Sequence, residues 1–208
     1  MGQVSGYIVN GFMSAKMNNL DLLRKWMKLA YRAGPRSRGN SLIVDLKFLG
    51  ELDLVLRAME REIVSLPSPT EFEQRPDFLR SLSNQWVGLA YSTHHLVWTD
   101  RCLPEKLASA YEDLRLLRVQ LEKHEISTQR VKVADQKPID MVEFEPDGLG
   151  QWSKYYPRDP KRKFTQAAAL SYRGSMAWHV VDLRTRTSKW VERQSLADQL
   201  LAGWLEET

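Results

Sequence analysis

The sequence predicts an α+β protein: an N-terminal bundle or array of about four helices, then a smaller region with a β-hairpin and a C-terminal helix. Three observations lead to this class. Apolar residues recur at helical spacing up to about residue 121, alternate with polar residues beyond 125, and return to helical spacing at the end of the chain. With 43% apolar residues among 208, the chain has enough material for a hydrophobic core.

Each predicted helix has a start or stop signal. We expect helices over 18–33, 41–64, 76–98 and 104–121. Gly34 and Pro35 end the first helix, and Pro76 suits the first position of the third. The second helix has the widest apolar stripe and should be central, with Gly50 marking close packing or a bend. The short connections favour antiparallel packing.

The second half reads as strands and turns. Segments 163–172 and 176–183 predict a β-hairpin around Gly174, although the alanine run at 167–169 is also compatible with a helix. Residues 185–191 form a further strand or a turn. Ser195 should cap the last helix, whose inward positions are Leu196, Leu200, Leu201 and Trp204. We divide the chain into a helical region, 1–127, and a basic β-containing region, 128–208, or read both as one continuous domain.

Motifs for catalysis or metal binding do not stand out. There is no Walker loop, and Gly148-Leu149-Gly150 reads as a turn. Adjacent His94 and His95 would point about 100° apart on a helix, so they do not easily share a metal ion. Cys102 is the single cysteine and predicts no internal disulfide. We therefore expect a non-catalytic protein with no cofactor and no metal, although a site can also assemble only in three dimensions.

Positive charge is concentrated in one stretch. Residues 1–150 carry 20 basic and 20 acidic side chains, whereas 151–193 carry ten basic side chains against three acidic ones. Seven aromatic residues interleave with these ten cations. Lysine and arginine neutralise phosphates, and exposed aromatic rings stack on unpaired bases. Earlier in the chain, Arg36 and Arg38 precede a helix N-terminus, which also favours an anion.

The leading hypothesis is a nucleic-acid-binding protein, with RNA favoured over DNA. On a hairpin, Tyr172 and Trp178, together with Trp190, would line a stacking platform edged by arginines. The candidate binding residues are Arg36, Arg38, Arg158, Lys161, Arg162, Lys163, Tyr172, Arg173, Trp178, Arg184, Arg186 and Lys189.

The alternative is a membrane-peripheral, matrix-like or protein-interaction scaffold, with an acidic protein or lipid surface as partner and with homo-oligomers allowed. Gly2 gives a weak N-myristoylation pattern, because Gly6 stands where the simple motif has Ser or Thr. We expect a cytoplasmic or nuclear protein, since no secretory signal and no apolar stretch of about 20 residues are present.

Overall fold

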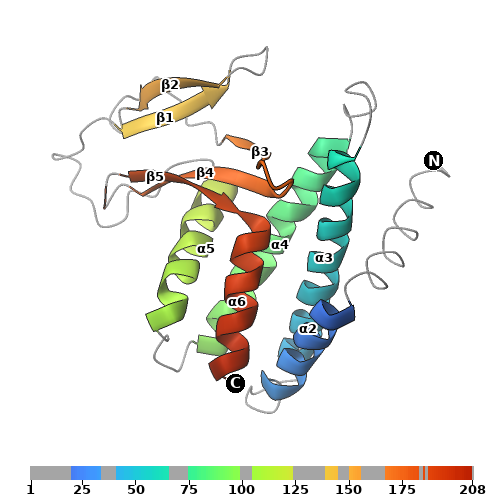
Figure 1. Ribbon diagram of the computed structural model, residues 1–208. Coiled ribbons are helices and arrows are strands. Elements are labelled where there is room, and N and C mark those ends of the chain that lie inside the picture. The colour runs from blue at the N-terminus through green and yellow to red at the C-terminus, as the bar shows by residue number, and fades with distance from the viewer. Residues whose placement is uncertain are drawn as a thin grey trace.

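The computed structural model confirms the α+β class (Figure 1). It describes residues 20–33, 41–65, 75–98, 105–123, 139–144, 150–155, 167–182, 185 and 187–207. Within these residues the helices are α2 (Leu20–Ala33), α3 (Ser41–Val64), α4 (Arg75–Trp98), α5 (Glu105–Lys123) and α6 (Arg193–Glu207). The four predicted N-terminal helices are therefore present, with bounds within a few residues of those expected.

The strands form two antiparallel sheets. β1 (Ile139–Phe144) pairs with β2 (Gly150–Tyr155) in a two-stranded sheet. β3 (Ala168–Leu170), β4 (Met176–Asp182) and β5 (Thr187–Glu192) form a three-stranded sheet in that order. The predicted hairpin is confirmed as β3–β4, and the segment left as strand or turn is the edge strand β5. In Figure 1 this sheet lies across one end of the helices, and β1–β2 lies on its far side.

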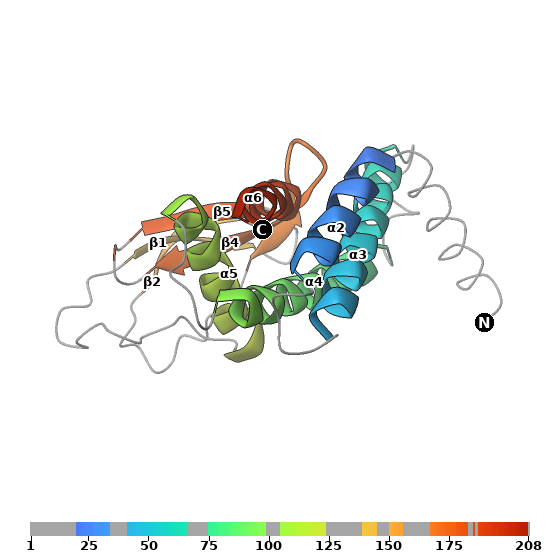
Figure 2. The ribbon, with the colours of Figure 1, turned by 90° about the horizontal axis from the view of Figure 1, so that it is seen from below.

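One hydrophobic cluster joins the N-terminal helices to the sheet and to α6. Its largest members are Trp26 of α2, Trp86 of α4, Trp178 of β4 and Trp204 of α6, all buried. Seen from below, α6 lies between α5 and α2, and it contacts both (Figure 2). The C-terminal helix therefore completes the core that α2–α5 begin.

Gly50 marks close packing between α2 and α3. A Cβ atom at this position would lie 2.5 Å from Cβ of Trp26, closer than two carbon side-chain atoms approach each other. The absence of a side chain at Gly50 lets the indole of Trp26 lie against α3. The prediction of close packing at this position is confirmed.

The start of α6 differs from the prediction. The four residues expected to face inward, Leu196, Leu200, Leu201 and Trp204, are buried. The helix begins at Arg193, however, so Ser195 lies inside the first turn and the predicted cap is wrong. The hydroxyl of Ser195 instead accepts a hydrogen bond from Nε2 of Gln199 at 3.2 Å.

Candidate functional site

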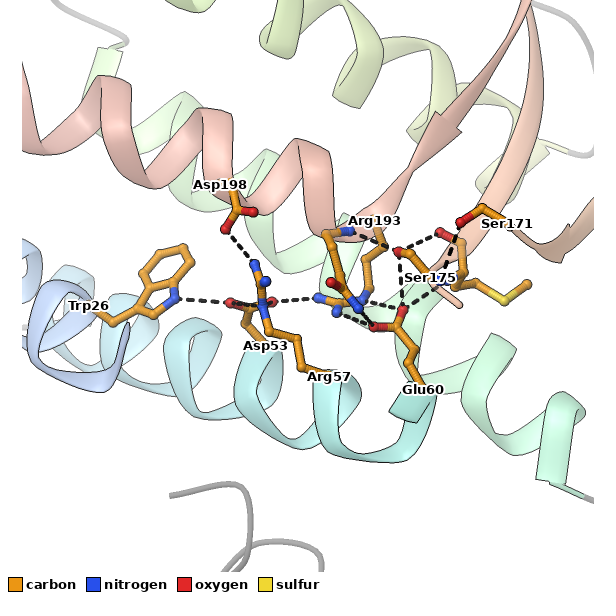
Figure 3. A network of polar contacts seen from close by, with 10 residues as sticks. Trp26, Asp53, Arg57, Glu60, Ser171, Ser175, Arg193 and Asp198 are labelled. Atoms are coloured by element: carbon orange, nitrogen blue, oxygen red, sulfur yellow. Dashed lines mark hydrogen bonds and ion pairs between the residues drawn. The ribbon is translucent and has the colours of Figure 1, made fainter. Parts of the chain in front are cut away.

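A buried ionic network links α3 to the start of α6 (Figure 3). Arg193 is 0% exposed, and its Nε and Nη2 donate to the two carboxylate oxygens of Glu60 at 2.9 and 2.6 Å. Its Nη1 donates to Oδ1 of Asp53 at 2.5 Å. Burial alone would lower the pKa of Arg193, but the charges of Glu60 and Asp53 outweigh burial and raise it. Arg193 therefore stays charged in the core.

The buried part of the network is balanced in charge, and the third carboxylate, Asp198, has a side chain that is 58% exposed. Arg57 donates through Nε to both oxygens of Asp53, at 3.0 and 3.1 Å, and through Nη2 to Asp198 of α6 at 2.6 Å. The indole N–H of Trp26 also donates to Asp53, at 3.1 Å. Buried charges are costly unless they are paired and hydrogen-bonded, and here Arg57 and Arg193 meet Asp53 and Glu60.

Glu60 also holds the end of the β3–β4 hairpin. Its Oε1 accepts the backbone N–H of Met176 at 2.8 Å, and its Oε2 accepts Nε2 of Gln194 at 2.7 Å. The hydroxyl of Ser175 accepts the backbone N–H of Gln194 at 3.1 Å. This contact satisfies a first-turn donor of α6, which is the role of a helix cap. The cap comes from the hairpin loop.

The hairpin loop, residues 171–175, has a fixed conformation. The N–H of Ser171 donates to the carbonyl of Ser175, and the N–H of Gly174 donates to the carbonyl of Ser171, both at 2.8 Å. Gly174 has a φ of 76°, which a residue with a side chain rarely adopts. A Cβ atom there would lie 2.6 Å from Cγ2 of Val64, so the loop lies directly against the end of α3.

An exposed aromatic–cation pair projects from this loop. Tyr172 is 88% exposed, and Nε of Arg173 donates to its hydroxyl oxygen at 2.8 Å. The guanidinium carbon lies 5.3 Å from the centre of the tyrosine ring, within cation–π range. The arrangement offers a ring surface and a positive charge to a partner, on a loop that is tied to the core.

The predicted stacking platform does not form as expected. Trp178 is 0% exposed, and its indole N–H donates to Oδ1 of Asn84 on α4 at 3.1 Å. Its place on an exposed platform is therefore a wrong prediction: the ring fills the core. In the β4–β5 register Trp178 lies opposite Val191, whereas Trp190 lies opposite His179. Neighbouring residues on a strand point to opposite faces, so Trp178 and Trp190 do not share a face.

One predicted binding cation, Lys189, and one other basic residue of the 151–193 stretch, Arg193, lie away from the hairpin loop 171–175, which we call the tip. Lys189 on β5 forms an ion pair with Asp113 on α5. Burial raises the pKa of Asp113, and the hydrogen bond from Lys189 opposes that shift. Arg193, which contributes to the charge surplus, is neutralised in the core. The remaining candidates lie outside the described residues: Arg36, Arg38, Arg158, Lys161, Arg162, Lys163, Arg184 and Arg186.

Sequence reasoning missed Asp53, Glu60, Ser175 and Arg193, which together position the tip. A signal for two of them exists, because Asp53 and Glu60 are two helical turns apart within the apolar stripe of α3. An acidic residue on such a stripe needs a buried partner. The sequence carries no corresponding signal for Arg193, because its carboxylate partners Glu60 and Asp53 lie 133 and 140 positions away.

Comparisons with known proteins do not assign the chain to a family. No family model, no curated protein and no solved structure matches the chain. None of the helices in the described ranges is long and apolar enough to span a bilayer. The same described residues contain no group of three or more His, Cys, Asp or Glu side chains placed to hold a metal ion.

Proposed function

We propose that the protein binds single-stranded nucleic acid, RNA in preference to DNA, without catalysing a reaction. The observation that carries this proposal is the exposed Tyr172–Arg173 pair on a loop tied to a buried ionic network. An unpaired base stacks on the tyrosine ring, and the guanidinium contributes charge and a second stacking surface. Base–aromatic stacking is worth about 1–3 kcal/mol per base. A loop that is already ordered loses little entropy on binding.

The phosphates are bound by cations in two connections of the C-terminal region. Segment 156–166, between β2 and β3, carries Arg158, Lys161, Arg162 and Lys163, and segment 183–186, between β4 and β5, carries Arg184 and Arg186. Because β3 and β4 are antiparallel, the start of β3 and the end of β4 both point away from the hairpin loop. Ala168 at the start of β3 pairs with Trp178, two residues from Met176, whereas β4 ends at Asp182, six residues from Met176. At about 3.3 Å per residue, the start of β3 lies roughly 7 Å and the end of β4 roughly 20 Å from the hairpin end of β4.

The test is the binding of a fluorescent single-stranded RNA at 50 and 200 mM salt, measured by anisotropy. Charge neutralisation predicts that log K falls with log[salt], with a slope of about 0.7 per neutralised phosphate on a single strand. Replacing Arg162, Lys163, Arg184 and Arg186 together with Gln should flatten that slope. An affinity that does not change with salt, or a slope unchanged by the four substitutions, would refute the electrostatic part of the proposal.

Tyr172→Ala tests the stacking part, and the chain offers a matched control. Tyr31 on α2 is also an exposed tyrosine beside a cation, because Nζ of Lys47 lies 3.3 Å from its hydroxyl and 4.7 Å from its ring centre. It lies in the charge-balanced part of the chain. We expect Tyr172→Ala to weaken RNA binding by about 1–3 kcal/mol and Tyr31→Ala to leave it unchanged. Equal effects of the two substitutions would contradict a specific role of the tip.

A second candidate function is protein interaction, including self-association, through the outer face of α2 and α3. Val44 and Phe48 are 63% and 53% exposed, are four residues apart on α3, and therefore share a face. Lys47 on the intervening turn reaches Tyr31 of α2. Light scattering over a range of concentrations tests this candidate. A mass above that of one chain that falls to one chain in Phe48→Glu supports it, and a single-chain mass at all concentrations contradicts it.

A further inference from the structure

A cleft of about 370 Å³ lies between α5 and the β4–β5 pair, at the end of the sheet away from the hairpin tip. Its polar walls are Ser109, Glu112, Asp182, Thr185, Thr187 and Lys189. This volume falls in the range of about 300–1,000 Å³ that is typical of small-ligand sites. Arg184 and Arg186 stand on either side of Thr185 in the sequence, so the cleft opens beside one of the two cationic connections.

The cleft itself is not basic. Glu112 takes two hydrogen bonds from Arg115, at 2.9 and 2.7 Å, and Asp113 pairs with Lys189. Asp182 accepts the hydroxyl of Thr185 at 2.9 Å. The hydrogen bond to Glu112 and the charges of Glu112 and Asp182 raise the pKa of Arg115. Among the described residues that line the cleft, two are carboxylates, Glu112 and Asp182, and one is a cation, Lys189, which Asp113 already pairs. The charge of these lining residues therefore favours a hydrogen-bond donor over a phosphate.

A group that enters this cleft must instead donate hydrogen bonds to carboxylates. A carboxylate offers about four acceptor positions on two oxygens, so it can accept from a ligand in addition to its protein donors. Leu116 and Val180 form an apolar part of the wall, against which the face of a flat ring can pack. An amino-bearing nucleobase satisfies both demands, because its edge donates and its ring face is apolar. Glutamate and aspartate accept from the amino group of cytosine in known readout.

We infer that this cleft is a base-reading pocket that selects cytosine over uracil, with Glu112 and Asp182 accepting from the cytosine amino group. The inference rests on the proposed function and deepens it by naming the base. Cytosine and uracil have rings of the same size. They differ where cytosine presents an amino donor and uracil presents a carbonyl acceptor, which two carboxylates would repel. The salt-dependent contacts of other cations with phosphates provide binding affinity, and the cleft provides the preference for cytosine over uracil.

The experiment compares the affinities of single-stranded oligocytidylate and oligouridylate of equal length for the full chain, at one salt concentration. We expect oligocytidylate to bind at least about fivefold more tightly, the lower limit for one good base contact. Glu112→Gln and Asp182→Asn should each reduce this ratio, because a side-chain amide offers a donor to the uracil carbonyl. Asp77→Asn is the control: Asp77 is exposed on α4, and its substitution changes the net charge by the same amount.

The possible outcomes distinguish failure of this inference from failure of the proposed function. Equal affinity of the unmodified protein for both oligonucleotides overturns the inference while leaving nucleic-acid binding in place, and this comparison requires no variant. A preference that survives both Glu112→Gln and Asp182→Asn also overturns it, because the discrimination would then arise elsewhere. Failure to bind either oligonucleotide overturns the proposed function, and the inference with it.

Discussion

Replacing Arg193 with Leu removes the cation that two buried carboxylates share. Arg193 makes three charge-assisted hydrogen bonds, one to Asp53 and two to Glu60, and all three side chains are 0% exposed. Asp53 keeps its bonds from Arg57 and Trp26, whereas Glu60 keeps only neutral donors among the contacts described above. Breaking a buried pair by removing one partner costs about 3–5 kcal/mol. For a chain of this length that corresponds to a drop in Tm of roughly 6–20 °C.

Urea unfolding followed by circular dichroism measures this loss. An unchanged m-value shows that the variant exposes the same amount of surface on unfolding as the unmodified protein. The control is Arg24→Leu, which removes an arginine from an exposed pair with Asp21, where the side chains are 69% and 90% exposed. That substitution should cost no more than about 1 kcal/mol. If Arg193→Leu costs no more than Arg24→Leu, the network does not hold α6 to α3, and the position of the hairpin loop does not depend on it.

Three further predictions concern stability. Burial lowers the pKa of His94 from 6.5 to about 4, so the unfolded chain takes up a proton first as the pH falls. The stabilisation from neutral His94 is fully present above pH 6.5 and is lost, by up to about 3 kcal/mol, as the pH falls towards 4. Urea unfolding at a series of pH values measures this loss, and His94→Asn should remove it. In Gly203→Ala the new methyl group would clash with Leu107 and cost about 1–3 kcal/mol in urea unfolding, whereas Gly88→Ala meets no atom within 4 Å and should gain about 0.5–1 kcal/mol. Tyr172→Ala should change the free energy of unfolding by less than about 0.5 kcal/mol, because the side chain is 88% exposed; a larger loss would mean that its effect on RNA binding reflects folding.

The helices could be predicted because their signals are local. Pro35 and Pro76 mark boundaries that follow from backbone geometry, and the spacing of apolar residues fixes the inward face of α6. The faces of the strands depend on pairing register, which lies beyond any local signal. Leu170 pairs with Met176, so Tyr172 belongs to a loop and takes no part in strand alternation. A shift of β5 by one residue relative to β4 would place Trp190 on the same face as Trp178.

The candidate site could be predicted only in part, for the same reason. Arg173 lies in the predicted turn around Gly174, which is a local pattern, whereas the sequence predicts Tyr172 at the end of a strand and the residue lies in the loop because β3 ends at Leu170. The pairing of Arg193 with Asp53 joins residues 140 positions apart in the sequence, and only the packing of α6 on α3 brings them together. A count of charges along the chain treats Arg193 and Lys189 as available cations, although protein carboxylates already pair with both.

The shared acid Glu60 makes the two halves of the polypeptide complementary partners. A cleavage between α5 and β1 would leave Asp53 and Glu60 on one piece and Arg193 on the other, each with buried charge and apolar surface that only the other piece can cover. We expect such pieces, expressed together, to reassemble in the manner of a split reporter, and each alone to precipitate.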